Sequence, residues 1–237
     1  MTTKTLDPIA TAGTPVPAAP PIPAQVVQPP DAGWIPVAFP AGAWKRWLRR
    51  RQRRKADRPD EVWDGVYLIM PDPNINHQEL VGKLTFAFMS GLTEIPDARV
   101  FPGTNVSDRQ EDWTKNYRCP DVAVFLPGNP AEARGTHWFG GPDFAVEIVS
   151  KGDRSRDKFD FYARTGVREL LYVERQPWAL ELYRRVGQHW ILTGRSYPPD
   201  QRVLESTILP LSFRSIPDQP RPRIEVFGRN GRGPWLA

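Results

Sequence analysis

Residues 143–150 read DFAVEIVS and residues 119–126 read CPDVAVFL, and these two stretches decide the fold. Each is an apolar run of the length and composition of one buried strand. Each also carries an acid, Asp121 near the start of the earlier stretch and Glu147 in the middle of the later one. A carboxylate among apolar side chains is costly to bury unless something compensates it. The pair therefore predicts a chemical site on two strands of one sheet.

Helix and strand patterns alternate around these stretches. Apolar residues recur at helical spacing over residues 76–92, and residues 153–165 predict a second helix that ends at Gly166. A helix in this second place suits a crossover that returns a parallel strand to the same sheet. We therefore expect a mixed sheet flanked by helices, a three-layer α/β fold. Residues 202–216 are apolar in patches and fit no period. Residues 63–70 contain an Asp-Gly turn signal and then a strand-like run, and residues 99–106 indicate a short broken strand. Further strands are predicted over residues 169–174, 178–185 and 189–193.

The N-terminal part of the 237-residue chain differs in composition from the rest. Ten of the 27 prolines fall in residues 1–40, which hold few large apolar side chains, so we expect a disordered tail there. Residues 41–58 contain nine Lys or Arg and one acid, a net charge of +8, whereas residues 59–237 sum to −2. The basic character thus belongs to one short arm, and we expect the folded domain to occupy residues 59–237.

The basic arm at residues 41–58 has helical spacing of its own. Trp44, Trp47 and Leu48 would share one face, and the remaining faces would be cationic. Such a segment fits an arm that grips nucleic-acid phosphates, a helix that lies on a membrane surface, or a solvated linker whose tryptophans pack on the body. The sequence leaves these three interpretations open.

Composition also narrows the location of the protein. No run approaches 18 apolar residues, which argues against a membrane span, and residues 1–10 lack the pattern of a signal peptide. The only cysteine, Cys119, can form neither an internal disulfide nor a thiolate metal cluster. We therefore expect a cytoplasmic protein in a reducing setting.

A divalent cation is the natural partner for the two acids. Carboxylates at neighbouring strand ends are ligands that Mg²⁺ prefers, and Mn²⁺ is a substitute. Such an ion polarises a phosphodiester and lowers the pKa of a bound water. Alternation along the strand puts residue 149 beside Glu147, and that residue is Val149. A cationic side chain must then come from Lys151 or from Lys158, which shares a helical face with Tyr162.

Several linked motifs resemble one family. The stretches NYRCPDVAVFL (116–126), GPDFAVEIVS (141–150) and DKFDFYARTGVRELLYVE (157–174) look like the Uma-type restriction endonucleases, a branch of the PD-(D/E)xK nuclease superfamily. EVWDGVYLIMPDPNINHQELVGKL (61–84) is similar to the opening strand, loop and His-containing helix of that family. The resemblance runs over residues 61–185, more than half of the chain.

The resemblance implies a restriction-endonuclease-like fold and Mg²⁺-dependent hydrolysis of DNA. The motif acids fall on Asp121 and Glu147, while the motif lysine falls on Val149. Members with this departure carry a lysine on the next helix, which matches Lys158. The first helix of the family adds a polar group, for which His77 is the best match here and Glu79 a weaker one.

We therefore expect Asp121, Glu147 and the carbonyl of Ile148 to hold Mg²⁺. Lys158, or less favourably Lys151, would stabilise the developing negative charge. A homodimer is expected, because cutting both strands of DNA invites two-fold symmetry. Two other functions stay open: an inactive nucleic-acid-binding protein on the same fold, which the missing motif lysine favours, and a metal-free interaction protein in which the acids form salt bridges.

Overall fold

The computed structural model describes residues 43–53, 60–70, 73–149 and 154–237. These residues all belong to one unit, which spans residues 39–237. The predicted tail at residues 1–40, residues 54–58 of the arm, and Lys151 lie outside the described residues. In the ranges that are described, every helix is too short or too polar to cross a membrane.

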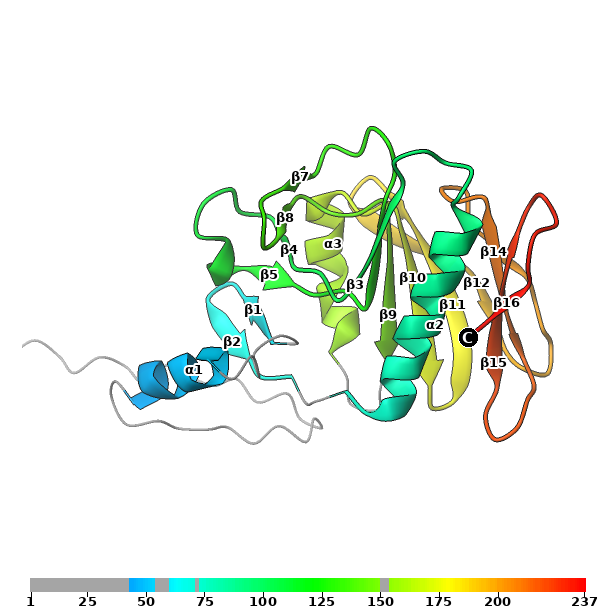
Figure 1. Cartoon of the computed structure of the whole chain (residues 1–237), viewed down its shortest axis with the longest axis horizontal. Coiled ribbons are helices and arrows are strands. Elements are labelled where there is room, and N and C mark those ends of the chain that lie inside the picture. Colours follow the sequence, from blue (N-terminus) through cyan, green and yellow to red (C-terminus); the bar gives the residue numbers. More distant parts are fainter. Residues whose placement is uncertain (1–42, 54–59, 71–72, 150–153) are drawn as a thin grey trace, which may run out of the picture. The chain divides into compact units, whose positions relative to one another are not determined.

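The two acid-bearing stretches form neighbouring strands at the centre of a six-stranded sheet. β6 (Val122–Phe125) pairs antiparallel with β9 (Phe144–Val149), and β9 pairs in parallel with β10 (Glu169–Arg175). This parallel step confirms the predicted crossover. The sheet order is β12-β11-β10-β9-β6-β3 (Figure 1), in which the remaining strands are β3 (Arg99–Pro102), β11 (Trp178–Val186) and β12 (His189–Ser196).

The crossover between β9 and β10 begins more tightly than predicted. A 3-10 turn, η2 (Ser155–Lys158), precedes the short helix α3 (Phe159–Thr165). Neither segment has a side chain that caps its first N–H groups, which fits a tight i→i+3 start rather than a full α-helix over 153–165. Gly166 ends the helix as predicted, with a φ of 93° that a residue without Cβ adopts at little cost.

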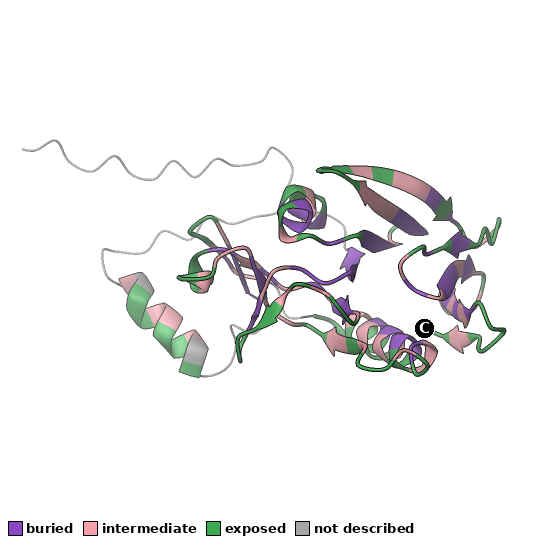
Figure 2. Ribbon diagram, turned by 90° about the horizontal axis from the view of Figure 1, so that it is seen from above, coloured by how far each residue is buried: buried purple, intermediate pink, exposed green. Residues whose placement is uncertain are grey.

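The helix predicted at residues 76–92 is α2 (Ile75–Gly91). Asn74 caps its start, because its Oδ1 accepts a hydrogen bond from the His77 N–H at 2.9 Å. Buried side chains on one side of α2 pack against one face of the central sheet, while α3 packs on the other face. In Figure 2 the buried residues follow the strands and one side of α2. The apolar residues that α2 buries are Leu80, Leu84, Ala87 and Phe88.

The Asp-Gly turn predicted at the start of residues 63–70 is confirmed, and the strand-like run after it forms the second strand of a hairpin. The segment is a hairpin in which β1 (Glu61–Trp63) and β2 (Val66–Leu68) flank Asp64 and Gly65, whose φ angles are 46° and 86°. Positive φ at both turn positions matches the twist of the strands and closes a two-residue turn. The hairpin opens a second sheet of order β2-β1-β5-β4-β8-β7, with β4 (Val106–Ser107), β5 (Tyr117–Arg118), β7 (Glu132–Ala133) and β8 (Trp138–Phe139).

A third sheet covers the same face of the central sheet as α2. Its antiparallel strands are β13 (Leu204–Glu205), β14 (Leu211–Ile216), β15 (Arg223–Gly228) and β16 (Trp235–Leu236). Leu211, Phe213, Ile224 and Val226 share one apolar core with α2. Residues 202–216, which showed no period in the sequence, form two strands that pair with each other, and β14 also pairs with the later strand β15.

Candidate active site

Asp121 and Glu147 stand opposite each other on neighbouring strands. Val122 pairs with Val146 in antiparallel register, so the next residues outward, Asp121 and Glu147, share one face of the sheet. The Asp121 Oδ2 accepts a hydrogen bond from the Ile148 N–H at 2.7 Å. One oxygen of this carboxylate is therefore fixed by the backbone of β9.

The Glu147 carboxylate is buried, with 2% of the residue exposed. Both of its oxygens accept hydrogen bonds from the Lys158 ammonium, at 3.0 Å each, and the Tyr162 hydroxyl donates to Oε1. Burial raises the pKa of Glu147 to about 8, and the charges of Asp121 and Glu61 act in the same direction. Lys158 and Tyr162 lower this pKa without cancelling the rise that burial causes.

Lys158 lies at the end of η2 and is 6% exposed. Besides Glu147, its ammonium contacts Glu61 Oε1 at 2.9 Å. Burial alone would lower the pKa of Lys158, but the charges of Glu147 and Glu61 outweigh it and raise the pKa well above the ordinary value. The lysine therefore stays charged inside the fold. Tyr162, four residues later, contacts the same carboxylate, in line with their shared helical face.

Glu61 was not among the predicted site residues. It is the first residue of β1 and is 1% exposed. Besides Lys158, it accepts hydrogen bonds from the Cys119 N–H at 2.8 Å and from the Trp63 indole N–H at 2.7 Å. One weak sequence signal could have indicated Glu61: it lies two residues before Trp63, so the two side chains share a strand face. Only the packing of the hairpin against Lys158 makes it part of the site.

The first turn of α2 brings His77 to the same site. His77 Nε2 lies 3.2 Å from Asp121 Oδ1, and its Nδ1 is buried with no hydrogen-bond partner among the described residues. Glu79, the weaker match, instead pairs with Lys83 at 2.6 Å and with Arg221 at 2.8 Å on the exposed side of the helix. Of these two residues, only His77 contacts a motif acid.

Val149 occupies the place of the motif lysine. It is 7% exposed and packs in an apolar cluster with Ala145, Tyr162 and Tyr172 on the face that carries Glu147. An ammonium at this position would lose its water to apolar neighbours, whereas Lys158 reaches the acids from the crossover. The structure therefore brings together Asp121, Glu147, Lys158 and His77, with the Ile148 backbone beside them.

The site has more negative than positive charge. Among the described residues, Glu61 and Glu147 both contact the Lys158 ammonium, and Asp121, which contacts His77, adds its charge to theirs. Within the described ranges, no three His, Cys, Asp or Glu side chains form a complete metal cage. Mg²⁺ needs only one or two protein carboxylates, because it keeps several waters. Asp121 and Glu147 therefore form a donor set that fits this ion.

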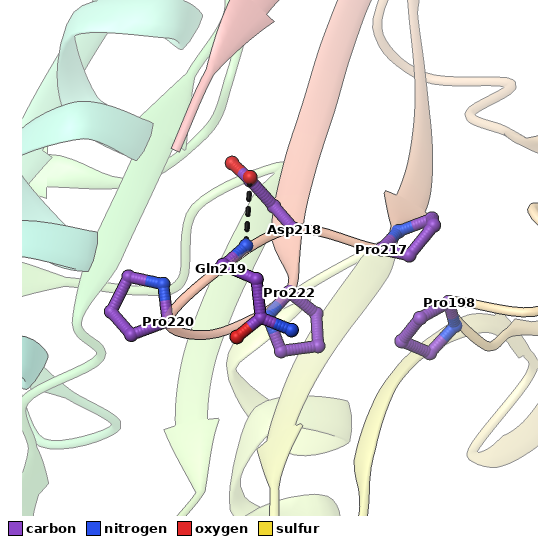
Figure 3. A pocket seen from close by; sticks show the side chains of 6 residues that line it. All are labelled: Pro198, Pro217, Asp218, Gln219, Pro220 and Pro222. Carbon is purple, nitrogen blue, oxygen red and sulfur yellow. Dashed lines mark hydrogen bonds between the residues drawn. The ribbon is translucent and has the colours of Figure 1, made fainter.

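A surface hollow lies away from these residues, beside the loop between β14 and β15. Its one acidic lining residue, Asp218, forms an ion pair with Arg223 and accepts a hydrogen bond from the Gln219 N–H at 2.7 Å (Figure 3). The hollow brings together no cluster of reactive groups, so the candidate site stays at the central sheet. The residues that line it are Pro198, Pro217, Asp218, Gln219, Pro220 and Pro222.

Comparison with known proteins identifies the family. A solved structure of a putative nuclease belonging to DUF820 from Anabaena variabilis is similar to this chain, with 17% identity and a TM-score of 0.48. The match covers 62% of this chain and 80% of that one. No curated protein is significantly similar. The model of the Uma2 family, described as "Putative restriction endonuclease", matches residues 45–231 and extends beyond the motifs at both ends. Because that match takes in most of the chain, the protein belongs to the Uma2 family, as its motifs indicated.

Proposed function

We propose that this protein is a Mg²⁺-dependent DNA endonuclease whose metal-binding acids are Asp121 and Glu147. One observation carries the proposal: Asp121, held by the Ile148 N–H, lies beside the buried carboxylate of Glu147, and the Lys158 ammonium contacts Glu147, an arrangement that suits one divalent cation next to a fixed positive charge. Membership of a nuclease family supports hydrolysis of a phosphodiester.

Asp121, Glu147 and the carbonyl of Ile148 would hold Mg²⁺, or Mn²⁺ in its place. When bound, the ion would polarise the phosphodiester and lower the pKa of a coordinated water. His77 would orient Asp121, because its ring nitrogen contacts Oδ1 while the Ile148 N–H holds Oδ2. The two contacts restrict the rotation of the carboxylate and so preorganise the ligand.

Lys158 would supply a permanent positive charge beside the metal-binding acids. Its pKa is raised by Glu147 and Glu61 despite burial, so it stays protonated and can stabilise the negative charge that develops on the phosphate. Tyr162 donates to Glu147 Oε1 and would fix the orientation of this acid. Lys151, the weaker alternative for the cation, lies outside the described residues.

A second candidate function is that of an inactive nucleic-acid-binding protein on the same fold. Two observations favour it: Val149 replaces the motif lysine, and the Lys158 ammonium already contacts two carboxylates. A buried ion pair of this kind is also compatible with a purely structural role.

Nicking of supercoiled plasmid separates the two candidates. The endonuclease proposal expects cutting by the wild type with Mg²⁺ or Mn²⁺, and none with a chelator. Asp121→Asn should abolish cutting, while Asp160→Asn, which changes an exposed acid on α3, should cut like the wild type. Retained DNA binding without any cutting would favour the binding protein. Cutting by Asp121→Asn at the wild-type rate would reject the assigned site.

A homodimer and a cytoplasmic location belong to the same proposal. The support for the dimer is the symmetry of duplex DNA, whose two strands present related phosphodiesters. The support for the location is the substrate itself, DNA inside the cell. Sedimentation of the purified protein at several concentrations tests the dimer, and a single monomeric species would reject it.

A further inference from the structure

Helix α1 (Ala43–Arg53) presents a face made of arginine alone. Arg46, Arg49, Arg50 and Arg53 recur at i, i+3, i+4 and i+7, so they lie on one side of the helix, and all four are exposed. At a rise of 1.5 Å per residue, this arginine face extends over about 10 Å. The helix contains no acid that would neutralise it.

On the opposite side of α1, Arg51 contacts the folded body through Asp60. Trp47, Leu48 and Arg51 are half-buried there, and the Arg51 guanidinium lies 5.3 Å from the centre of the Trp47 ring. Arg51 also forms a two-pronged ion pair with Asp60, in which Nε and Nη2 donate at 3.0 Å and 2.8 Å. The apolar side of the helix is therefore partly covered, and its fully exposed side is cationic.

Asp60 anchors the arm to the hairpin that contributes Glu61. It is fully buried and also accepts hydrogen bonds from the Tyr67 hydroxyl at 2.6 Å and the Met70 N–H at 3.0 Å. Burying a carboxylate is costly unless its partners are held in place, so this network favours one fixed position for Arg51. A linker that is merely solvated needs no such anchor.

The charge of the arginine face favours a negatively charged partner. Like charges at i, i+4 destabilise a helix, and Arg46–Arg50 and Arg49–Arg53 are two such pairs, so a polyanion laid along them would relieve the repulsion. A membrane-surface helix inserts its apolar face, whereas Trp47 and Leu48 are half-buried. Guanidinium groups match phosphate oxygens in geometry as well as charge.

We propose that the arginine face of α1 binds the phosphate backbone of duplex DNA and so helps to hold the substrate of the central site. This inference rests on the proposed nuclease function, because it assigns the arm to the same substrate. Each phosphate neutralised on duplex DNA contributes about 0.9 to the slope of log affinity against log salt, so four contacts contribute about 3.6.

The test compares two full-length quadruple variants. One replaces Arg46, Arg49, Arg50 and Arg53 by glutamine, and the other replaces them by lysine. Binding to a fluorescent duplex is measured by anisotropy with a chelator present, from about 50 to about 200 mM salt. The slope of log affinity against log salt should be smaller by up to about 3.6 in the glutamine variant than in the wild type. Over this range of salt, the affinity of the wild type for DNA should therefore fall about 100-fold more than that of the glutamine variant. The lysine variant should keep most of the slope, because it keeps the charge.

Two outcomes overturn the inference. One is a glutamine variant with the wild-type slope and affinity. The other is an unchanged slope on DNA together with lost binding to vesicles of anionic lipid, which would assign the face to a membrane. If the quadruple variants do not fold, the double variant Arg49→Gln with Arg50→Gln replaces them. Its slope of log affinity against log salt should be smaller by about 1.8 than that of the wild type. Plasmid nicking distinguishes failure of this inference from failure of the proposed function. If the wild type nicks plasmid and the glutamine variant binds DNA as well as the wild type, only the role of the arginine face is rejected. If DNA binding depends on the arginine face but the wild type does not nick plasmid, only the nuclease function is rejected.

Discussion

The Lys158→Met variant tests whether the positive charge of the Lys158 ammonium stabilises the fold by neutralising the buried acids around it. The Lys158 Nζ lies 3.0 Å from both oxygens of Glu147 and 2.9 Å from Glu61 Oε1, and 7% of its side chain is exposed. Methionine retains an apolar stem but no charge, so the buried carboxylates of Glu147 and Glu61 lose the ammonium that they share. Removing one partner of a buried ion pair costs about 3–5 kcal/mol, a large part of the total stability of about 5–15 kcal/mol.

Urea unfolding of the metal-free proteins near pH 7, followed by tryptophan fluorescence, measures this loss. Lys83→Met is the matched control, since Lys83 pairs with Glu79 on the exposed side of α2 and 41% of its side chain is exposed. We expect that control to change the free energy of unfolding by less than about 0.5 kcal/mol. The double variant Lys158→Met with Glu61→Gln removes one charge of each sign and should recover part of the loss.

Divalent metal gives an independent readout of the same variant. If Mg²⁺ binds between Asp121 and Glu147, it should stabilise Lys158→Met by about 2.7 kcal/mol at 100 times its dissociation constant. Adding Asp121→Asn should abolish this gain. A urea midpoint of Lys158→Met equal to that of the wild type would refute the reasoning, because it would mean that the buried acids need no cation.

The remaining predictions address pH, metal and packing. Because the folded pKa of Glu147 is about 8, above its ordinary value of 4.5, its contribution to stability is complete below about pH 4.5 and disappears as the pH rises through 8. Glu147→Gln should therefore flatten the fall in unfolding free energy between about pH 4.5 and pH 8, and an unchanged fall would assign it to other groups. Mg²⁺ should raise the melting temperature of the wild type but not of Asp121→Asn; an equal rise in both would place the metal elsewhere. Gly141→Ala should cost about 1–3 kcal/mol, because a Cβ there would lie 2.9 Å from the Thr165 carbonyl oxygen, whereas Gly82→Ala meets nothing within 4 Å and should stabilise α2 by up to about 1 kcal/mol. Similar urea midpoints for the two alanine variants would contradict this packing argument.

Local sequence determined the central strands and the end of the crossover helix. The apolar runs around Asp121 and Glu147 can be read without a structure, because strand alternation and burial depend on residues one or two positions apart. The same rule put Val149 on the face of Glu147, and the lack of a Cβ at Gly166 indicated where α3 ends. These features follow from short-range periodicity and backbone sterics.

Contacts between distant segments were decided only by the tertiary structure. Glu61 lies just before the Asp-Gly turn that the sequence indicates, but its role beside Lys158 exists only because β1 packs against the crossover. His77 reaches Asp121 only because α2 starts beside the start of β6. The third sheet forms because β14 finds β15 and a shared apolar core, which no local period in residues 202–216 encodes. In each case burial of the side chain depends on a partner remote in sequence, and periodicity along one segment carries no information about that partner.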